Sequence, residues 1–167
     1  NLVFPDKNIL LSTPDITLPH IVLTENVQPV WGGIVLFNLT GKPSANLRLR
    51  AVIQGKEMTT DVPVVTALNS RKVGFKMDAS AVLQKGEVVC ELTLLQNDKV
   101  IDQKTITLQA VLPNEHYSNT FISAIDGSVQ YFGVAPQKGG QKDTAALFLF
   151  VLGEGAEAIG QATAYKS

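Results

Sequence analysis

Short blocks of alternating apolar and polar residues run through the chain up to about residue 112, and helical periodicity is nearly absent there. In the clearest block, residues 46–54, Arg48 and Arg50 share one side. The other side carries four apolar residues: Leu47, Leu49, Ala51 and Ile53. Because successive side chains of a strand point to opposite faces, such a block predicts a strand with one buried face. The first two thirds of the chain therefore predict an all-β fold, with both arginines facing water.

Six further segments are rich in strand-forming residues: residues 16–23, 30–39, 59–66, 72–77, 87–95 and 105–111. Their clearest inward positions are Val73, Phe75, Met77, Val88, Cys90, Leu92 and Leu94. Asn97-Asp98 predicts a hairpin between the last two segments. Prolines at positions 14, 19 and 63 suit edge strands or bulges, because proline cannot donate to a ladder. About seven strands in roughly a hundred residues predict an immunoglobulin-like antiparallel β-sandwich domain over residues 1–115.

Charge and cysteine content exclude several classes of partner. The chain has 14 Lys+Arg against 15 Asp+Glu, without a basic run, so we expect no nucleic acid partner. One cysteine and two histidines allow no intramolecular disulfide and no structural zinc spacing. We therefore expect no metal and no cofactor. The longest apolar run, residues 145–152, is far shorter than the ~20 residues of a membrane-spanning helix, so no membrane span is expected.

The pattern changes after residue 112. Residues 113–116 have the composition of a linker, and residues 128–134 predict a strand. Residues 145–152 are apolar without alternation, as in a parallel strand buried on both faces, and residues 156–165 favour a helix. We therefore expect residues 116–167 to hold a linker and the truncated start of an α/β domain, as in a fragment. In the alternative, residues 145–152 complete the sandwich and residues 156–165 form a tail.

Residues 120–131, together with residues 147–158 and Gly160-Gln161-Ala162, resemble the entry into the catalytic domain of bacterial α/β-hydrolases of the prolyl-oligopeptidase-like and esterase type. These enzymes carry an N-terminal accessory β domain. The resemblance makes residues 128–135 the opening antiparallel strand of the hydrolase sheet and residues 145–152 the strand before the oxyanion loop. It implies an oxyanion-loop role for the backbone around Gly153, Glu154 and Gly155. Many such enzymes have a His-Gly pair where this chain has Leu152-Gly153.

The groups needed for acyl transfer are missing from this sequence. There is no GxSxG motif, and Ser128 fits the start of a strand better than a nucleophile. His20 and His116 have no partner implied by spacing and fit edge or surface positions. We therefore predict no catalytic residue here and no activity for this chain alone. The parent protein is a candidate serine hydrolase of the α/β-hydrolase type.

Three other residues have a functional and a structural interpretation. Trp31 beside Gly32-Gly33 could stack on a sugar ring, although packing is the more common role of such a side chain. Asn38-Leu39-Thr40 matches the glycosylation pattern, which would place Asn38 on the surface; alternatively, these residues end a strand before a turn. Cys90 fits a small buried apolar position without a redox role.

The resemblance favours a non-catalytic accessory β-sandwich that supports or gates the catalytic domain of the same parent protein, in a bacterial periplasm or outside the cell. Exposed strand edges also predict that the apolar run at residues 145–152 pairs with its own sandwich, with the strand at residues 128–134 or with a second copy of the chain. A symmetric homodimer or a strand swap is the favoured form. The alternative function is a free-standing module that binds a glycan or a protein through its loops or Trp31.

Overall fold

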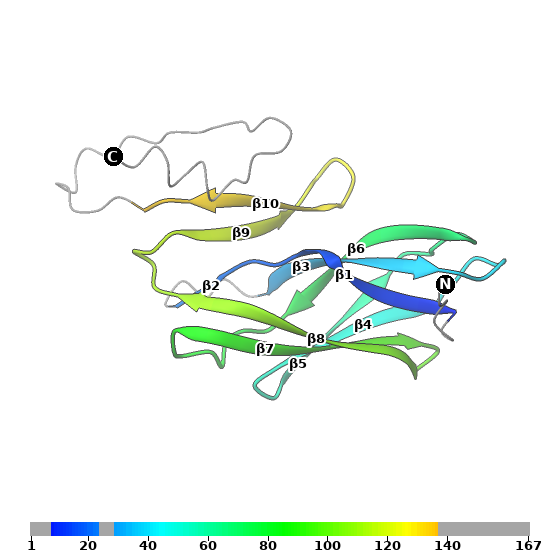
Figure 1. Cartoon of the computed structure of the whole chain (residues 1–167), viewed down its shortest axis with the longest axis horizontal. Coiled ribbons are helices and arrows are strands. Elements are labelled where there is room, and N and C mark those ends of the chain that lie inside the picture. Colours follow the sequence, from blue (N-terminus) through cyan, green and yellow to red (C-terminus); the bar gives the residue numbers. More distant parts are fainter. Residues whose placement is uncertain (1–7, 24–28, 137–167) are drawn as a thin grey trace, which may run out of the picture.

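The computed structural model describes residues 8–23 and 29–136, and all regular elements in these ranges are β-strands (Figure 1). The strands are β1 (Ile9–Thr17), β2 (Ile21–Val22), β3 (Val30–Asn38), β4 (Leu47–Ile53), β5 (Lys56–Val62), β6 (Asn69–Met77), β7 (Gly86–Gln96), β8 (Lys99–Val111), β9 (Tyr117–Ile122) and β10 (Val129–Val134). The prediction of an all-β fold is confirmed.

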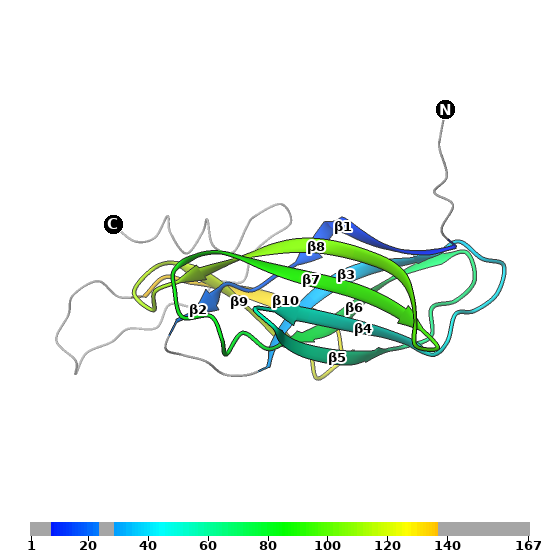
Figure 2. The same cartoon turned by 90° about the horizontal axis from the view of Figure 1, so that it is seen from below.

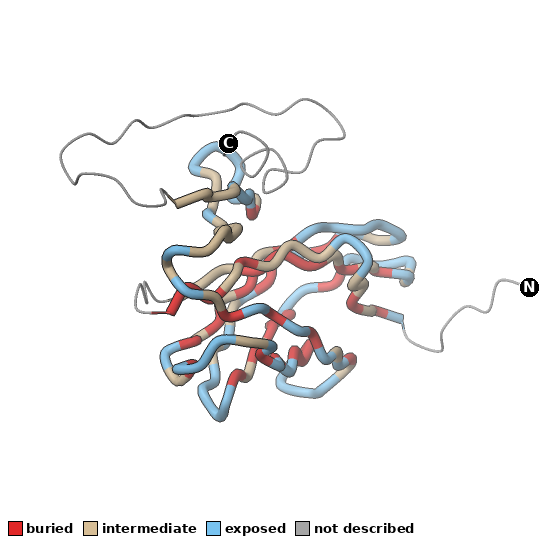
Figure 3. The backbone as a smooth tube through the Cα atoms, turned by 60° about the vertical axis from the view of Figure 1, so that its left-hand side comes forward, coloured by how far each residue is buried: buried red, intermediate tan, exposed pale blue. Residues whose placement is uncertain are grey.

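Two sheets pack face to face as a β-sandwich. One has the strand order β1-β3-β6 and the other β2-β8-β7-β4-β5 (Figure 2). All pairs in them are antiparallel except the short parallel pair of β2 with β8. Buried segments of both sheets face each other in Figure 3 and form one apolar cluster. Because each sheet has one apolar face, packing the two faces together removes both from water.

The predicted inward faces are confirmed on β4, β6 and β7. On β4, burial alternates strictly, with Leu49 fully buried and Arg48 and Arg50 only partly covered. Arg48 forms an ion pair with Asp98 at the surface. Cys90 is fully buried, and burial raises the pKa of its thiol to about 11. It therefore fills the core as an unreactive apolar side chain.

Two tight turns connect strands of the larger sheet. The predicted hairpin turn at Asn97-Asp98 joins β7 to β8, with φ angles of 48° and 66°. Gln54-Gly55 makes a second such turn between β4 and β5, with φ angles of 46° and 79°. Paired positive φ angles match the right-handed twist of the flanking strands.

The N-terminal part differs from the prediction of one strand at residues 16–23. β1 starts at Ile9 and belongs to the smaller sheet, whereas β2 belongs to the larger sheet. Pro19 lies between them, where the chain crosses from one sheet to the other. Pro14 falls in the irregular stretch of edge strand β1, as its missing donor requires. The strand predicted at residues 59–66 is also shifted: β5 ends at Val62, just before Pro63.

Side chains bridge the two sheets at both sides of the sandwich. Asp102 on β8 is buried and accepts a hydrogen bond from the Leu11 amide of β1 at 2.8 Å. On the opposite side, the Thr60 hydroxyl of β5 accepts one from the Lys76 amide of β6 at 2.8 Å. Both bonds satisfy backbone donors of edge strands, which otherwise invite pairing with another chain.

β9 and β10 form a separate two-stranded antiparallel sheet (Figure 1). β10 matches the strand predicted at residues 128–134, whereas β9 is a strand that the sequence did not predict. The expected strand at residues 145–152 and the expected helix at residues 156–165 lie outside the described residues, as does their alternative as a sandwich strand and tail. Residues 8–23 and 29–136 contain no helix and no helix-covered parallel sheet of the α/β type.

Candidate functional site

A pair of glycines on the outer face of the smaller sheet receives the β9–β10 hairpin. Gly33 of β3 lies directly opposite Gly74 of β6. A Cβ atom at Gly74 would lie 2.9 Å from Val129 Cγ2, and one at Gly33 would lie 3.2 Å from Val129 Cβ. The Val129 side chain on β10 therefore fills the space that two side chains would occupy, and it is 8% exposed. The absence of both side chains allows the hairpin to approach the sheet.

Trp31 contacts the same hairpin from the neighbouring position on β3. Its carbonyl oxygen accepts a 2.6 Å hydrogen bond from the Thr120 hydroxyl of β9. The Lys76 ammonium, on its cross-strand partner, lies 5.4 Å from the centroid of the indole ring. An ammonium at this distance interacts favourably with the π face of the ring. Trp31 is thus partly buried and braces the hairpin contact.

Both the backbone and the side chain of His20 form hydrogen bonds with Ser118, near the start of β9. Its amide donates to the Ser118 carbonyl at 2.9 Å, and its Nδ1 accepts from the Ser118 amide at 2.9 Å. The Ser118 hydroxyl lies 2.9 Å from the same nitrogen. Because Nδ1 accepts a bond from a backbone amide, it carries no proton in this arrangement. Partial burial lowers the pKa of His20 below its ordinary value, which favours the same neutral form.

Glu115 fixes the connection that leads from β8 into the hairpin. Its carboxylate accepts from the Leu112 amide at 2.9 Å and from the Lys85 ammonium. The hydrogen bond with Lys85 is the largest cause of the lowered pKa of Glu115, and the bond from the Leu112 amide lowers it further. The connection is thus held by side chains as well as by the short chain itself.

The two faces of the hairpin differ in their surroundings. Ser118, Thr120 and Val129 lie on the face that contacts the sandwich. Phe121 and Phe132 lie on the other face, with ring centroids 6.2 Å apart, and are 47% and 43% exposed. The arrangement can hold a second sheet in a fixed position on the sandwich while it presents aromatic side chains outward.

The predicted site residues lie in different places. Trp31 belongs to the hairpin contact, whereas Gly153, Glu154 and Gly155 lie outside the described residues. Ser128 precedes β10 and donates its hydroxyl to the Asp126 carboxylate at 2.7 Å, which confirms its position at a strand start. That bond is the largest cause of the lowered pKa of Asp126.

The sequence did not predict the contact between His20 and Ser118, because the two residues are 98 positions apart. A histidine after a proline carries no signal for a bond to a distant backbone amide. The Gly32-Gly33 pair beside Trp31 was a usable signal, because consecutive glycines inside a strand indicate a close approach of another segment.

Asn38 is fully buried, which corrects the expectation that a glycosylated Asn38 would lie on the surface. Its Nδ2 donates to the carbonyl oxygens of Lys42, Val65 and Thr66 at 2.8 to 3.0 Å. Its Oδ1 accepts from the amide and hydroxyl of Thr40. The structural interpretation, in which the two residues end a strand before a turn, is confirmed.

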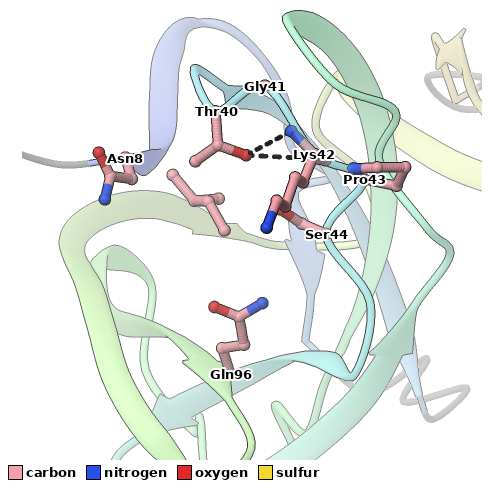
Figure 4. Close-up of a pocket in the computed structure, with 8 residues that line it drawn as sticks. Asn8, Thr40, Gly41, Lys42, Pro43, Ser44 and Gln96 are labelled. Carbon is pink, nitrogen blue, oxygen red and sulfur yellow. Dashed lines mark hydrogen bonds between the residues drawn. The ribbon is translucent and has the colours of Figure 1, made fainter.

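A shallow hollow beside this turn is drawn in Figure 4. The Thr40 hydroxyl in it lies 2.8 Å from the Lys42 carbonyl, which shares the single proton of that hydroxyl with Asn38 Oδ1, and it accepts from the Lys42 amide at 3.4 Å. A hydroxyl engaged by its own turn is held for structure rather than activated by a base. Trp31 does not line this hollow.

Two kinds of feature are absent from the described ranges. Residues 8–23 and 29–136 bring together no group of three or more His, Cys, Asp or Glu side chains that could hold a metal ion. Across the same residues, there is no helix with the length and apolar character needed to cross a membrane.

The chain matches no protein-family model and no curated protein. Solved structures that it resembles include two of the CARDB domain of one Pyrococcus furiosus protein. The solution NMR structure is 15% identical, with a TM-score of 0.44, over 62% of this chain and 94% of that chain. The crystal structure of that domain in complex with di-metal ions is 18% identical, with a TM-score of 0.42, over 66% of this chain and 94% of that chain. Likeness at this level does not extend to function.

Proposed function

We propose that this chain is the N-terminal accessory β-sandwich of a serine hydrolase of the esterase or peptidase type, with the first strands of the hydrolase domain attached. One observation carries the proposal: residues 120–131, which resemble a hydrolase entry, lie in a hairpin that forms a sheet of its own. A strand that opens a second domain is expected to leave the first sheet in this way. The parent's catalytic domain is then the partner of the sandwich.

We further infer that the sandwich is immunoglobulin-like. In that fold, strands A, B and E share one sheet and strands C, F and G share the other. β1, β3 and β6 fit the first set, while β4, β7 and β8 fit the second, with β5 as an additional C′ strand. The crossing of the N-terminal segment from β1 to β2 fits an A strand that divides between the two sheets.

The contacts of the hairpin support a positioning role for the sandwich. Val129 between Gly33 and Gly74 and the Thr120 bond tie the hairpin to the smaller sheet, while the Ser118 bond ties it to His20 in the crossing between β1 and β2. Since the same hairpin opens the catalytic domain in this proposal, the sandwich fixes the orientation of that domain. A fixed orientation allows an accessory domain to support or restrict access to an active site.

The test is reaction of the whole parent protein with a fluorophosphonate, which labels activated serine nucleophiles. We expect one labelled serine, located after residue 167, and no labelling of the 167-residue chain alone. Absence of labelling in the folded parent, or labelling of Ser128, would contradict the proposal.

A matched pair of variants in the parent then tests the positioning role. Gly74→Val places methyl groups where Val129 packs and is expected to change ester turnover. Gly41→Val is the control, because a Cβ at Gly41 meets nothing within 4 Å. Equal turnover in both variants would mean that the sandwich does not position the catalytic domain.

The free-standing binding module is the less favoured function. It would use Trp31 as a platform for a sugar ring, which needs an open ring face. In the described structure the Lys76 ammonium lies over that ring, and the Trp31 carbonyl is bonded to Thr120.

A further inference from the structure

Three loops meet at the end of the sandwich where β1 begins, away from β9 and β10 (Figure 1): residues 39–46, 63–68 and 97–98. Asn38 joins the first two loops through its bonds to carbonyl oxygens of both. Asn46 joins the first loop to the third, because its Nδ2 donates to Asn97 Oδ1 at 3.2 Å. The Asn97 amide also donates to the Asn46 carbonyl at 3.2 Å. The three loops form one connected surface, the loop end.

Leu68 in the loop end has a backbone conformation that is unfavourable for leucine. It lies in the turn before β6 with a φ of 51°, where glycine or asparagine is usual. Its amide donates to the Thr40 carbonyl at 3.0 Å, which holds the turn in place. The side chain is 76% exposed and gains no burial from this position. Folding therefore does not explain an exposed leucine in a strained turn, and such strain is typical of functional sites.

Other exposed side chains lie beside Leu68. Leu39 is in the loop whose backbone Leu68 contacts, and Val64 accepts a 3.2 Å hydrogen bond at its carbonyl from the Arg71 guanidinium. Both apolar side chains are exposed. Lys42 and Arg71 are exposed as well, and neither has an ion pair within residues 8–23 and 29–136. Apolar and cationic groups are thus mixed on one surface.

The loop end is net positive. Its loops and the strand ends beside them, residues 39–48, 61–71 and 96–99, carry four basic and two acidic side chains, whereas the whole chain has a net charge of −1. The six residues are Lys42, Arg48, Arg71, Lys99, Asp61 and Asp98. An anionic partner is therefore attracted to this end, and the same end of a second copy is repelled.

We propose that the loop end binds reversibly to the surface of an anionic phospholipid bilayer. The side chains of Leu39, Val64 and Leu68 enter the headgroup layer, and the two unpaired cations contact lipid phosphates. Interfacial binding combines these two properties, a small apolar area and an attraction to anionic lipid. A peptide is less suited, because Leu39 and Leu68 line neither of the two hollows beside these loops. The proposal rests on the sandwich alone and holds whether or not the parent protein is a hydrolase.

Co-sedimentation of the 167-residue chain with lipid vesicles tests the proposal. The vesicles consist of phosphatidylcholine with roughly 30% phosphatidylserine, and vesicles of phosphatidylcholine alone are the neutral comparison. We expect half-maximal binding of the unmodified chain at about a millimolar of anionic vesicle lipid. Binding to the neutral vesicles should be at least tenfold weaker.

Leu68→Asn removes the apolar side chain and places a residue that tolerates the left-handed φ. This variant should bind the anionic vesicles at least tenfold more weakly, while its urea midpoint stays the same or rises. Leu83→Asn is the matched control, because Leu83 is 80% exposed and lies between β6 and β7 at the opposite end of the sandwich. It should bind like the unmodified chain.

A second variant tests the charges. Lys42→Gln together with Arg71→Gln should weaken binding to the anionic vesicles roughly 25-fold, which is about fivefold for each cation. If Leu68→Asn does not fold, this double variant decides the question, and unchanged binding would count against the proposal.

Four results would overturn the proposal. The folded unmodified chain could stay in the supernatant, or it could bind neutral and anionic vesicles equally. Leu68→Asn and Leu83→Asn could lose binding to the same extent. Finally, the chain could associate with itself without vesicles and lose this association in Leu68→Asn, which would assign the loop end to a protein contact.

Discussion

The Asn38 side chain forms hydrogen bonds with the backbone of two loops that are not paired as strands. Its amide nitrogen donates to three carbonyl oxygens of two separate loops, and its oxygen holds the Thr40 hydroxyl. The Lys42 carbonyl also accepts from the Thr40 hydroxyl and the Val65 carbonyl from the Ser44 amide, so Asn38 adds a second donor at both. A buried amide that lost these partners would be costly. One buried side chain therefore joins the residue 40–44 turn to the residue 65–66 segment.

Replacing Asn38 by alanine is expected to destabilise the sandwich by about 3 kcal/mol, because all hydrogen bonds of this buried amide are lost together. Asn38→Asp should cost more, since a carboxylate would face three carbonyl oxygens. Urea unfolding of both variants measures these changes. Thr40→Ser keeps the hydroxyl and is the control, with an expected change below about 0.5 kcal/mol. If Asn38→Ala unfolds like the control, the bond network does not contribute to stability.

His20 gives the hairpin contact a dependence on pH. Its pKa in the folded chain is lowered, so the undocked histidine binds a proton more readily than the docked one. Docking is thus fully stable above the unfolded pKa of about 6.5 and weakens as the pH falls below it. The three carboxylates with lowered pKa values lose their contribution only at more acidic pH: Asp78, Glu115 and Asp126.

We expect exchange of the Ser118 amide to accelerate when the pH is lowered from about 7.5 to 5, after correction for the intrinsic rate. A His20→Gln variant keeps an acceptor without a titrating group, so its corrected rate should stay constant over this range. NMR titration of His20 itself should give a midpoint below 6.5. A midpoint at or above that value would show that docking does not favour the neutral ring.

At the scale of elements, β9 and β10 are held to the sandwich by few but specific contacts. Val129 packs against Gly33 and Gly74 as one apolar contact. Overpacking at such a contact typically costs 1–3 kcal/mol because neither backbone can retreat freely. The hairpin should therefore detach before the sandwich unfolds.

Gly74→Val is expected to release the hairpin from the smaller sheet while the sandwich stays folded. The measurement is NMR of the unmodified 167-residue chain and the variant: signals of Ser118, Thr120 and Val129 should shift, whereas those of Leu49 and Cys90 should not. Gly41→Val again serves as the control. Unchanged signals at Val129 would contradict the assigned contact.

Sequence alternation was sufficient for the strands that contribute apolar side chains to the core, such as β4, β6 and β7. β9 escaped prediction because its inward residues, Ser118 and Thr120, bind by hydrogen bonds and leave no apolar pattern. The division of the first strand into β1 and β2 depends on which sheet each half joins, and this is decided by distant partners. Trp31 could be singled out from the sequence. Its contact with β9 could not, because Thr120 is 89 positions away.

At the scale of the whole molecule, a single apolar core joins both sheets. Cys90 lies in the middle of it on β7, with no exposed surface and a pKa raised to about 11. A thiol in such a place reacts only when the whole sandwich opens, because the attacking species is the exposed thiolate.

We expect a maleimide reagent to label Cys90 at least a thousandfold more slowly in the folded chain than in urea-unfolded chain. Ser80→Cys provides an exposed thiol in the same fold, and this thiol should be labelled as fast as a cysteine in the unfolded chain. Fast labelling of native Cys90, with the exposed control as reference, would mean that β7 opens locally.

The parallel pairing of β2 with β8 has a mechanical consequence. Ile21 pairs with Ala110 and Val22 with Val111, and the Leu23 amide donates to the Val111 carbonyl at 2.9 Å. Tension applied between the chain before residue 21 and the chain after residue 111 pulls the two strands along their axes in opposite directions. The hydrogen bonds are then loaded in shear and break together rather than one by one. A pulling experiment should thus record a higher rupture force through these two points than through Leu47 of β4 and Val62 of β5, whose pairs unzip one by one toward the shared turn.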